Sequence, residues 1–259
     1  MPTPPTPAQE SPQTLDRREG PYGEVVLRRR GTHFEIIANG CFLMDTSDGR
    51  SERLLVDAAL DALPADRERP ALLVGGLGVG FSLVQAVQEP RWGRITVVER
   101  EPAVIDWHRD GPLAALTAPA LADPRTEVLA ADLLDHLRLV ADTPQRPGGE
   151  GCWDALCLDV DNGPDWTVTE GNEGLYAPAG LAACRDALTP GGVLAVWSAQ
   201  PSAAFEEALR GAGFVSVRTV EIPVVRGVPD VVHLARKAAE NAVGPCPYAA
   251  GSTYAVTGA

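Results

Sequence analysis

A glycine-rich loop followed by an acidic residue is the first feature of the sequence that could bind a ligand. An apolar run typical of a buried strand ends in a loop that contains Gly75, Gly76, Gly78 and Gly80. Glycine lets a backbone approach a ligand closely, and N–H groups at the start of the next helix are free to donate. Glu99 ends the following strand, where its carboxylate can accept hydrogen bonds from both ribose hydroxyls. The pattern predicts a nucleoside-containing cofactor; the alternative is a turn whose glycines serve packing alone.

The spacing of the glycines narrows the choice of cofactor. A dinucleotide fingerprint requires G-x-G-x-x-G, but counting from Gly76 places Phe81 at the third glycine position. The loop instead reads G-x-G-x-G through Gly76, Gly78 and Gly80, a pattern typical of class I methyltransferase-like domains. The expected cofactor is therefore S-adenosylmethionine or a close relative of it.

Further polar residues follow the next two predicted strands. Asp132 can accept a hydrogen bond from an adenine amino group, and it can also cap the helix that follows it. Asp159, Asp161 and Asn162 stand after the fourth strand, and ligands of open α/β sheets bind beyond the carboxyl ends of strands. Asp159 could hold an amine, accept its proton or balance a sulfonium charge. The alternative is a turn in which these side chains bond their own backbone.

The elements that must position these residues alternate between strand and helix from residue 51 to 237. Buried apolar strands alternating with helices imply a parallel sheet covered on both faces. The predicted fold is α/β: a Rossmann-like methyltransferase fold with a mostly parallel seven-stranded sheet. A small β-hairpin unit over 21–50 precedes it, with a turn at Asn39-Gly40, and Ser51 is the expected N-cap of the next helix. The last two strands lack a helix between them, which predicts a hairpin at one edge of the sheet.

The sequence also supports predictions for the two ends of the chain and for several isolated side chains. Residues 1–20 are rich in Pro, Thr and Gln and are expected to form a disordered arm, and 238–259 a flexible tail. The basic run 28–30 is expected on a solvated strand edge. Trp166 is expected to pack partly buried, the alternative being that it walls a pocket, and His108 is expected to lie on the surface of a helix.

Composition limits the partners. The 259 residues carry a formal charge of −13, which disfavours nucleic acid and anionic lipid. The five cysteines form no CxxC pair, and no His stands at ligand spacing from them, so neither a disulfide framework nor a metal site is expected. No apolar run approaches the roughly 20 residues of a membrane span. The expected setting is the cytoplasm, and the expected substrate is a small-molecule acceptor.

From about Glu24 to Lys237 the chain resembles the spermidine synthase family of polyamine aminopropyltransferases. The resemblance rests on the hairpin unit, the glycine loop and the stretches VVERE, AADLLDHL and LDVDNGP. It implies that Asp159 is the catalytic residue and also contacts the cofactor. The neighbouring positions Arg100 and Leu133 are expected beside the cofactor with Glu99 and Asp132. Asp161, Asn162 and Tyr176 are expected to bind substrate, and a homodimer is implied by the family.

Two departures from the family pattern concern the transferred group. Gly78 stands where the family has an Asp that binds the donor's amino group, and residues 46–53 replace an acidic segment that contains Tyr. A glycine loop without Asp is the form seen in methyltransferases, so methyl transfer to a small molecule is the first hypothesis. The alternatives are aminopropyl or aminocarboxypropyl transfer, an intramolecular reaction that releases methylthioadenosine, and a non-catalytic nucleoside-binding protein.

Overall fold

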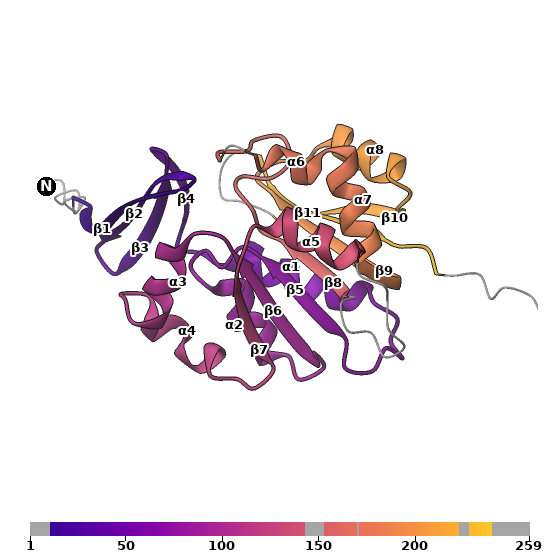
Figure 1. Cartoon of the computed structure of the whole chain (residues 1–259), viewed down its shortest axis with the longest axis horizontal. Coiled ribbons are helices and arrows are strands. Elements are labelled where there is room, and N and C mark those ends of the chain that lie inside the picture. Colours follow the sequence, from indigo (N-terminus) through magenta and orange to yellow (C-terminus); the bar gives the residue numbers. More distant parts are fainter. Residues whose placement is uncertain (1–10, 143–152, 170, 223–227, 240–259) are drawn as a thin grey trace, which may run out of the picture.

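The computed structural model describes residues 11–142, 153–169, 171–222 and 228–239. It contains a four-stranded antiparallel sheet and a seven-stranded sheet with helices on both faces (Figure 1). The strands of the first sheet are β1 Gln13–Gly20, β2 Gly23–Arg30, β3 His33–Ala38 and β4 Cys41–Asp45. Those of the second are β5 Ala71–Gly75, β6 Arg94–Glu99, β7 Thr126–Ala130, β8 Trp153–Leu158, β9 Leu188–Ser198, β10 Val215–Ile222 and β11 Asp230–Arg236. The helices are α1 Arg50–Ala62, α2 Phe81–Gln88, α3 Pro102–Arg109, α4 Ala114–Leu121, α5 Leu133–Asp142, α6 Glu173–Tyr176, α7 Pro178–Ala187 and α8 Ala203–Gly211.

The large sheet has the order β10-β11-β9-β8-β5-β6-β7. Strands β9, β8, β5, β6 and β7 pair in parallel, and β11 alone runs against its neighbours, pairing antiparallel with both β9 and β10. The predicted fold is therefore confirmed, including the terminal hairpin at one edge. Alternate side chains of each inner strand enter opposite cores, because successive residues of a strand face opposite sides. Val74 packs with α1 and α2, whereas its neighbour Leu73 packs with α5 and α7.

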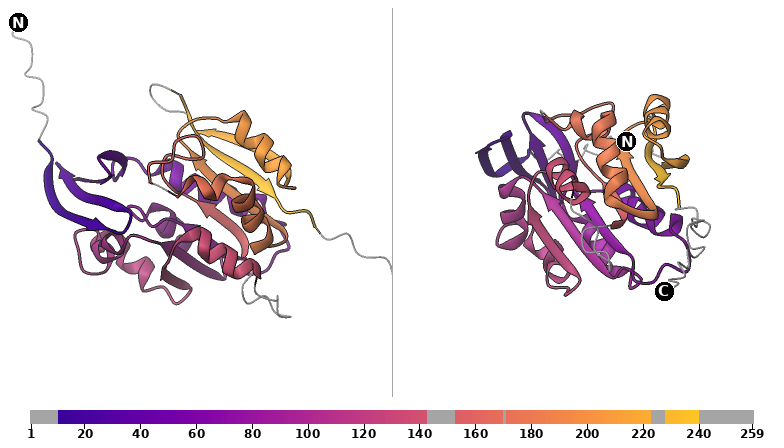
Figure 2. Two further views of the ribbon diagram at one scale, coloured as in Figure 1. Left: turned by 45° about the horizontal axis from the view of Figure 1, so that its top comes forward. Right: turned by 45° about the vertical axis from the view of Figure 1, so that its right-hand side comes forward.

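The N-terminal sheet is larger than the predicted hairpin unit. Residues 13–20, expected to belong to a disordered arm, form β1 and pair with β2 along its whole length. Trp107 Nε1 on α3 donates to Asp16 Oδ2 at 2.8 Å, and Arg18 pairs with Asp106 at 2.7 Å. These contacts fasten the N-terminal sheet beside α3, as the views in Figures 1 and 2 show. Residues 1–10 and 240–259, which include most of the predicted arm and tail, lie outside the described residues.

Three local predictions were wrong. The basic run is not on an edge, because β2 lies between β1 and β3, and Arg28 and Arg30 both pair with the buried carboxylate of Glu35. Helix α1 begins one residue before Ser51, whose hydroxyl instead donates to a neighbouring carboxylate. His108 is buried, with 1% of its surface exposed, because Thr117 Oγ1 and a backbone oxygen of the glycine loop satisfy its two ring nitrogens.

Cys157 lies in the core, as expected for a thiol inside an apolar run. Within the described ranges, no helix is long and apolar enough to span a membrane, and no group of three or more His, Cys, Asp or Glu side chains could hold a metal ion.

Candidate functional site

One cavity of about 510 Å³ lies between the N-terminal sheet and the carboxyl ends of the central strands β5, β6 and β8. Strand β4 and the start of α1 contribute one wall, and the loops after β5, β6, β7 and β8 contribute the other. The start of β11 also reaches it. This is the edge at which parallel α/β sheets bind ligands, because the loops there are free to diverge from the sheet.

The glycine loop has conformations and contacts that side chains would disrupt. Gly76 has a φ of +95°, and a Cβ there would lie 2.4 Å from the carbonyl oxygen of Asp159. Gly80 has a φ of +92° at the N-cap of α2, where a Cβ would meet Thr117 at 2.3 Å. Gly76 and Gly78 line the cavity, whereas Gly75 and Gly80 support the loop from behind. The glycines are therefore required by close approach on both sides of the loop.

Glu99 joins the glycine loop to the end of β6. Its Oε2 accepts from the backbone N–H of Leu77 at 2.9 Å, and its Oε1 accepts from the N–H of Glu101 at 2.8 Å. Burial raises the pKa of Glu99, while these backbone donors and Arg100 favour its charged form. Each carboxylate oxygen has more than one lone pair, so the side chain can hold the loop and still accept from a ribose hydroxyl.

Arg100, Asp132 and Leu133 gather beside Glu99, as the sequence predicts for the cofactor side. Arg100 stacks over the ring of Tyr22 at 4.2 Å and lies 3.7 Å from Asp132. Asp132 Oδ1 accepts from the N–H three residues later at 3.1 Å, so it caps α5 while its side chain also lines the cavity. Both roles considered for Asp132 are thus geometrically compatible.

Asp159 follows β8 directly, and its side chain lines the cavity. Its backbone N–H donates to the carbonyl oxygen of Gly75 at 2.9 Å, which holds it beside the glycine loop. Among the described residues its carboxylate has no hydrogen-bond partner. Burial, followed by the negative charge of Glu52, raises the pKa of Asp159 to about 8. A carboxyl group of this kind can take up a proton near neutral pH.

Asp161 and Asn162 lie in the same loop, but Asp161 is already engaged. Its carboxylate accepts from the N–H groups of Val168 and Thr169 at 3.1 and 3.3 Å, and from Asn172 Nδ2 at 2.7 Å. Asp161 thereby folds the loop over 161–172, which is the turn role considered for it, although its side chain also lines the cavity. Asn162 is buried at the cavity wall.

Tyr176 is not placed where the sequence predicts. Its ring lies in the core against Phe205, and its hydroxyl donates to the carbonyl oxygen of Val160 at 3.1 Å. Tyr176 is absent from the lining of the cavity and supports the loop after β8 from behind. Helix α6 holds the Tyr176 ring on the core side because it packs against α7.

The comparisons with known proteins agree with this architecture. Polyamine aminopropyltransferases of Mycobacterium tuberculosis and Mycobacterium bovis are 29% identical to the chain over 184 residues, which is 71% of this chain and 32% of each relative. The chain thus matches about a third of the length of these curated relatives. A spermidine synthase solved in complex with the transition-state analogue AdoDATO has a TM-score of 0.68 at 17% identity, covering 87% of this chain and 74% of that one.

The spermidine synthase of Thermotoga maritima has a TM-score of 0.66 at 16% identity, covering 87% of this chain and 73% of that one. The chain is thus similar to polyamine aminopropyltransferases in sequence and to spermidine synthases in fold. No protein-family model matches it. The likeness to the solved structures concerns the fold of this spermidine synthase-like chain, including its N-terminal sheet and its seven-stranded sheet.

Several residues that line the cavity or support it are not apparent in the sequence. Glu52 on α1 and Asp230 on β11 line the cavity, although they are distant in sequence from the strand ends that suggested a site. Trp166, expected to pack partly buried, is 58% exposed and also lines the cavity. Met44 of β4 accepts the N–H of Val79 on its sulfur at 3.1 Å. No local motif marks these positions; the acidic content of residues 45–52 could have indicated Glu52 alone.

Proposed function

We propose that the chain transfers an aminopropyl group from decarboxylated S-adenosylmethionine to a small-molecule amine. The observation that carries this proposal is the charge of the cavity. Among the described lining residues one is basic, Arg100, and ten are acidic: Glu24, Asp45, Asp48, Glu52, Glu99, Glu101, Asp132, Asp159, Asp161 and Asp230.

Such a cavity favours cations and disfavours a carboxylate, because charges interact more strongly at a site with little water. Decarboxylated S-adenosylmethionine carries a sulfonium and an ammonium but no carboxylate, whereas S-adenosylmethionine retains one. The names of the curated relatives support the same reaction. Aminopropyl transfer therefore replaces methyl transfer, the first hypothesis from the sequence.

The donor fits the cofactor side of the cavity. Glu99 presents buried carboxylate oxygens for ribose hydroxyls, and Asp132 stands beside it for the adenine amino group. Glu101 Oε2 is buried with no hydrogen-bond partner in the described structure, so a ligand hydroxyl or ammonium would satisfy it. The sulfonium supplies the leaving group for the reaction.

Asp159 is the proposed base. An amine enters as R–NH3⁺ and loses one proton to Asp159, which frees its nitrogen lone pair. The nitrogen then forms a bond to the carbon next to the sulfonium as the C–S bond breaks. Methylthioadenosine leaves as a neutral thioether, the product keeps one positive charge on its new secondary ammonium, and the proton passes to water.

The test incubates the full chain with 1,4-diaminobutane and either donor, followed by mass analysis of both products. The expected result is methylthioadenosine and an aminopropylated amine from the decarboxylated donor. The Asp159→Asn variant should be slower by about 10²- to 10⁴-fold, the usual contribution of a general base. S-adenosylhomocysteine formed from S-adenosylmethionine, or no turnover of either donor with any amine, would overturn the proposal.

The remaining expectations are part of the same proposal. A small-molecule acceptor is supported by the enclosed acidic cavity. The homodimer and the cytoplasmic setting stay predictions, the first of which light scattering of the purified chain can test.

A further inference from the structure

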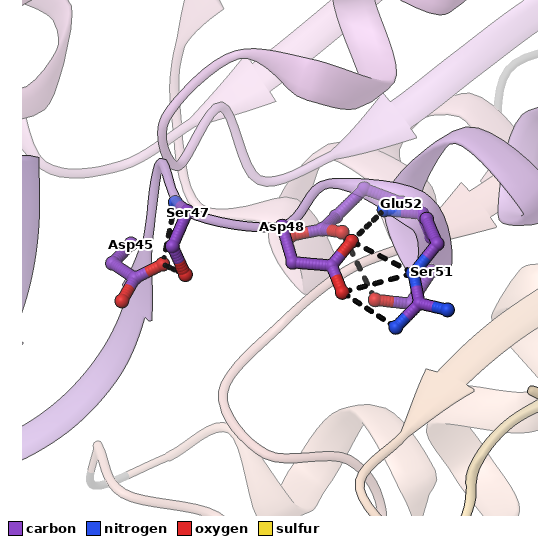
Figure 3. Close-up of polar contacts among 6 residues, drawn as sticks. Asp45, Ser47, Asp48, Ser51 and Glu52 are labelled. Atoms are coloured by element: carbon purple, nitrogen blue, oxygen red, sulfur yellow. Dashed lines mark hydrogen bonds and ion pairs between the residues drawn. The ribbon is translucent and has the colours of Figure 1, made fainter. Parts of the chain in front are cut away.

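The segment that joins β4 to α1 brings a second carboxyl group to Asp159. Asp45 accepts from Ser47, and Ser51 Oγ donates to Glu52 Oε2 at 2.9 Å (Figure 3). The Glu52 residue is 7% exposed although it lies in the first turn of a helix, and its side chain lines the cavity. The donors to this carboxyl group are neutral, its own backbone N–H and the Ser51 hydroxyl, so a buried charge on Glu52 is costly without a cationic partner.

Packing of α1 on β8 places Glu52 over Asp159. Cys157 Sγ contacts the carbonyl oxygen of Leu55 at 3.7 Å, which fixes the register between the helix and the strand. Glu52 and Leu55 are three apart and share a face of α1, while Cys157 and Asp159, which follows β8 directly, are two apart. Ser82 Oγ on α2 also donates to the carbonyl oxygen of Glu52 at 3.4 Å. Three packed elements therefore hold the two carboxyl groups at the cavity, Glu52 on the α1 wall and Asp159 on the wall that faces it.

We propose that Glu52 and Asp159 act as a proton-sharing pair that receives the reacting ammonium of the acceptor. This inference rests on the proposed function, to which it adds Glu52. The empty pair holds one proton and one negative charge, because two neighbouring buried carboxylates repel. Binding of R–NH3⁺ displaces that proton to water. When the amine gives up a proton to become nucleophilic, the pair takes it and returns to its one-proton state.

The charges around the pair support this assignment. Burial raises the pKa of Glu52, while Arg53 lowers it and Asp48 raises it. On the facing elements stand Asp159, directly after β8, and Asp230 of β11, the latter with a pKa raised by burial and by Asp48. Asp48 is held by the guanidinium of Arg50. Arg50 and Arg53 lie on α1 near Glu52 but do not line the cavity, and neither forms an ion pair with Glu52 or Asp159 in the described structure.

The Glu52→Gln variant tests the pair, because it keeps the side-chain length and removes the charge. The pH dependence of kcat/KM should shift its acidic limb to lower pH, since Asp159 loses a repelling neighbour. The KM for the amine should rise about tenfold or more, the effect of losing one charged hydrogen bond. Asp61→Asn is the matched control: Asp61 lies exposed on the same helix outside the cavity, and its loss should leave the pH profile unchanged.

A second measurement does not depend on turnover. Carbon-13 NMR of labelled Asp carboxyl groups, with Asp159→Asn used to assign the signal, reports the protonation of Asp159 directly. Its titration should move to lower pH in Glu52→Gln. An unchanged titration would overturn the pair whatever the activity. A shifted titration in a chain that transfers no aminopropyl group would uphold the pair and reject the proposed function.

Discussion

Replacement of Gly76 by alanine tests how tightly the glycine loop is built against Asp159. At a φ of +95° an alanine suffers backbone strain of about 1–2 kcal/mol. Its Cβ would also lie 2.4 Å from the carbonyl oxygen of Asp159. Because this oxygen belongs to the backbone, it cannot move aside as the end of a flexible side chain could. Overpacking of this kind costs about 1–3 kcal/mol. Gly76→Ala should therefore destabilise the fold by about 2–5 kcal/mol.

A second glycine variant separates backbone strain from the steric clash of the added Cβ. Gly40 in the β3–β4 turn has a φ of +79°, but a Cβ there meets nothing within 4 Å. Gly40→Ala should show the strain alone, about 1–2 kcal/mol. Urea unfolding of the two variants measures the difference, and each kcal/mol corresponds to about 2–4 °C in Tm for a chain of this size.

Activity gives an independent readout of the same change. The collision pushes on the backbone of Asp159, so Gly76→Ala should lower kcat in the fraction that remains folded, whereas Gly40→Ala should leave kcat unchanged. Equal destabilisation of the two variants, or normal kcat in Gly76→Ala, would refute the close approach of the loop to β8.

Three further changes probe other parts of the structure. Asp159→Asn should flatten the pH dependence of Tm between about pH 4 and 8. In the wild type the raised pKa of Asp159 contributes stability that is fully present below the unfolded pKa and is lost as the pH rises through about 8. The variant lacks this contribution. A parallel pH profile would contradict this. Trp107→Phe removes the donor to Asp16 and should lower the free energy of unfolding by about 1–2 kcal/mol, with faster hydrogen exchange in β1. Unchanged exchange would show that this hydrogen bond does not hold β1 against α3. Thr117→Val leaves the buried Nδ1 of His108 unpaired and should lower unfolding free energy by about 1–3 kcal/mol in calorimetry, and no loss would count against that bond.

The strand ends of the central sheet could be predicted from sequence because the relevant signals are local. Apolar runs ending in glycine or an acidic residue mark β5, β6 and β8, and parallel pairing brings their ends to one edge. Glu99, Asp132 and Asp159 therefore meet at the cavity, as their positions suggested. The wall opposite them depends on how the N-terminal sheet packs, which no local pattern specifies. Glu52 belongs to that wall.

The errors have a shared physical cause. Strand β1 has a polar sequence because it is an edge strand held largely by hydrogen bonds and charges, among them Arg18 with Asp106. Its composition therefore resembles a disordered segment. His108 is buried because Thr117 and the carbonyl oxygen of Gly78 satisfy its ring, and these partners come from other parts of the chain. Tyr176 has the expected residue type, but the packing of α6 turns it into the core.

The order β10-β11-β9 also has a consequence for how the molecule assembles. Strand β10 is synthesised before β11, yet in the sheet it pairs only with β11. It therefore has no partner strand until β11 emerges and inserts beside β9. Asp230, at the start of β11, completes the cavity in the same event. On a ribosome the cavity should close only after β11 has been made, which makes insertion of β11 a late step in the folding of the seven-stranded sheet.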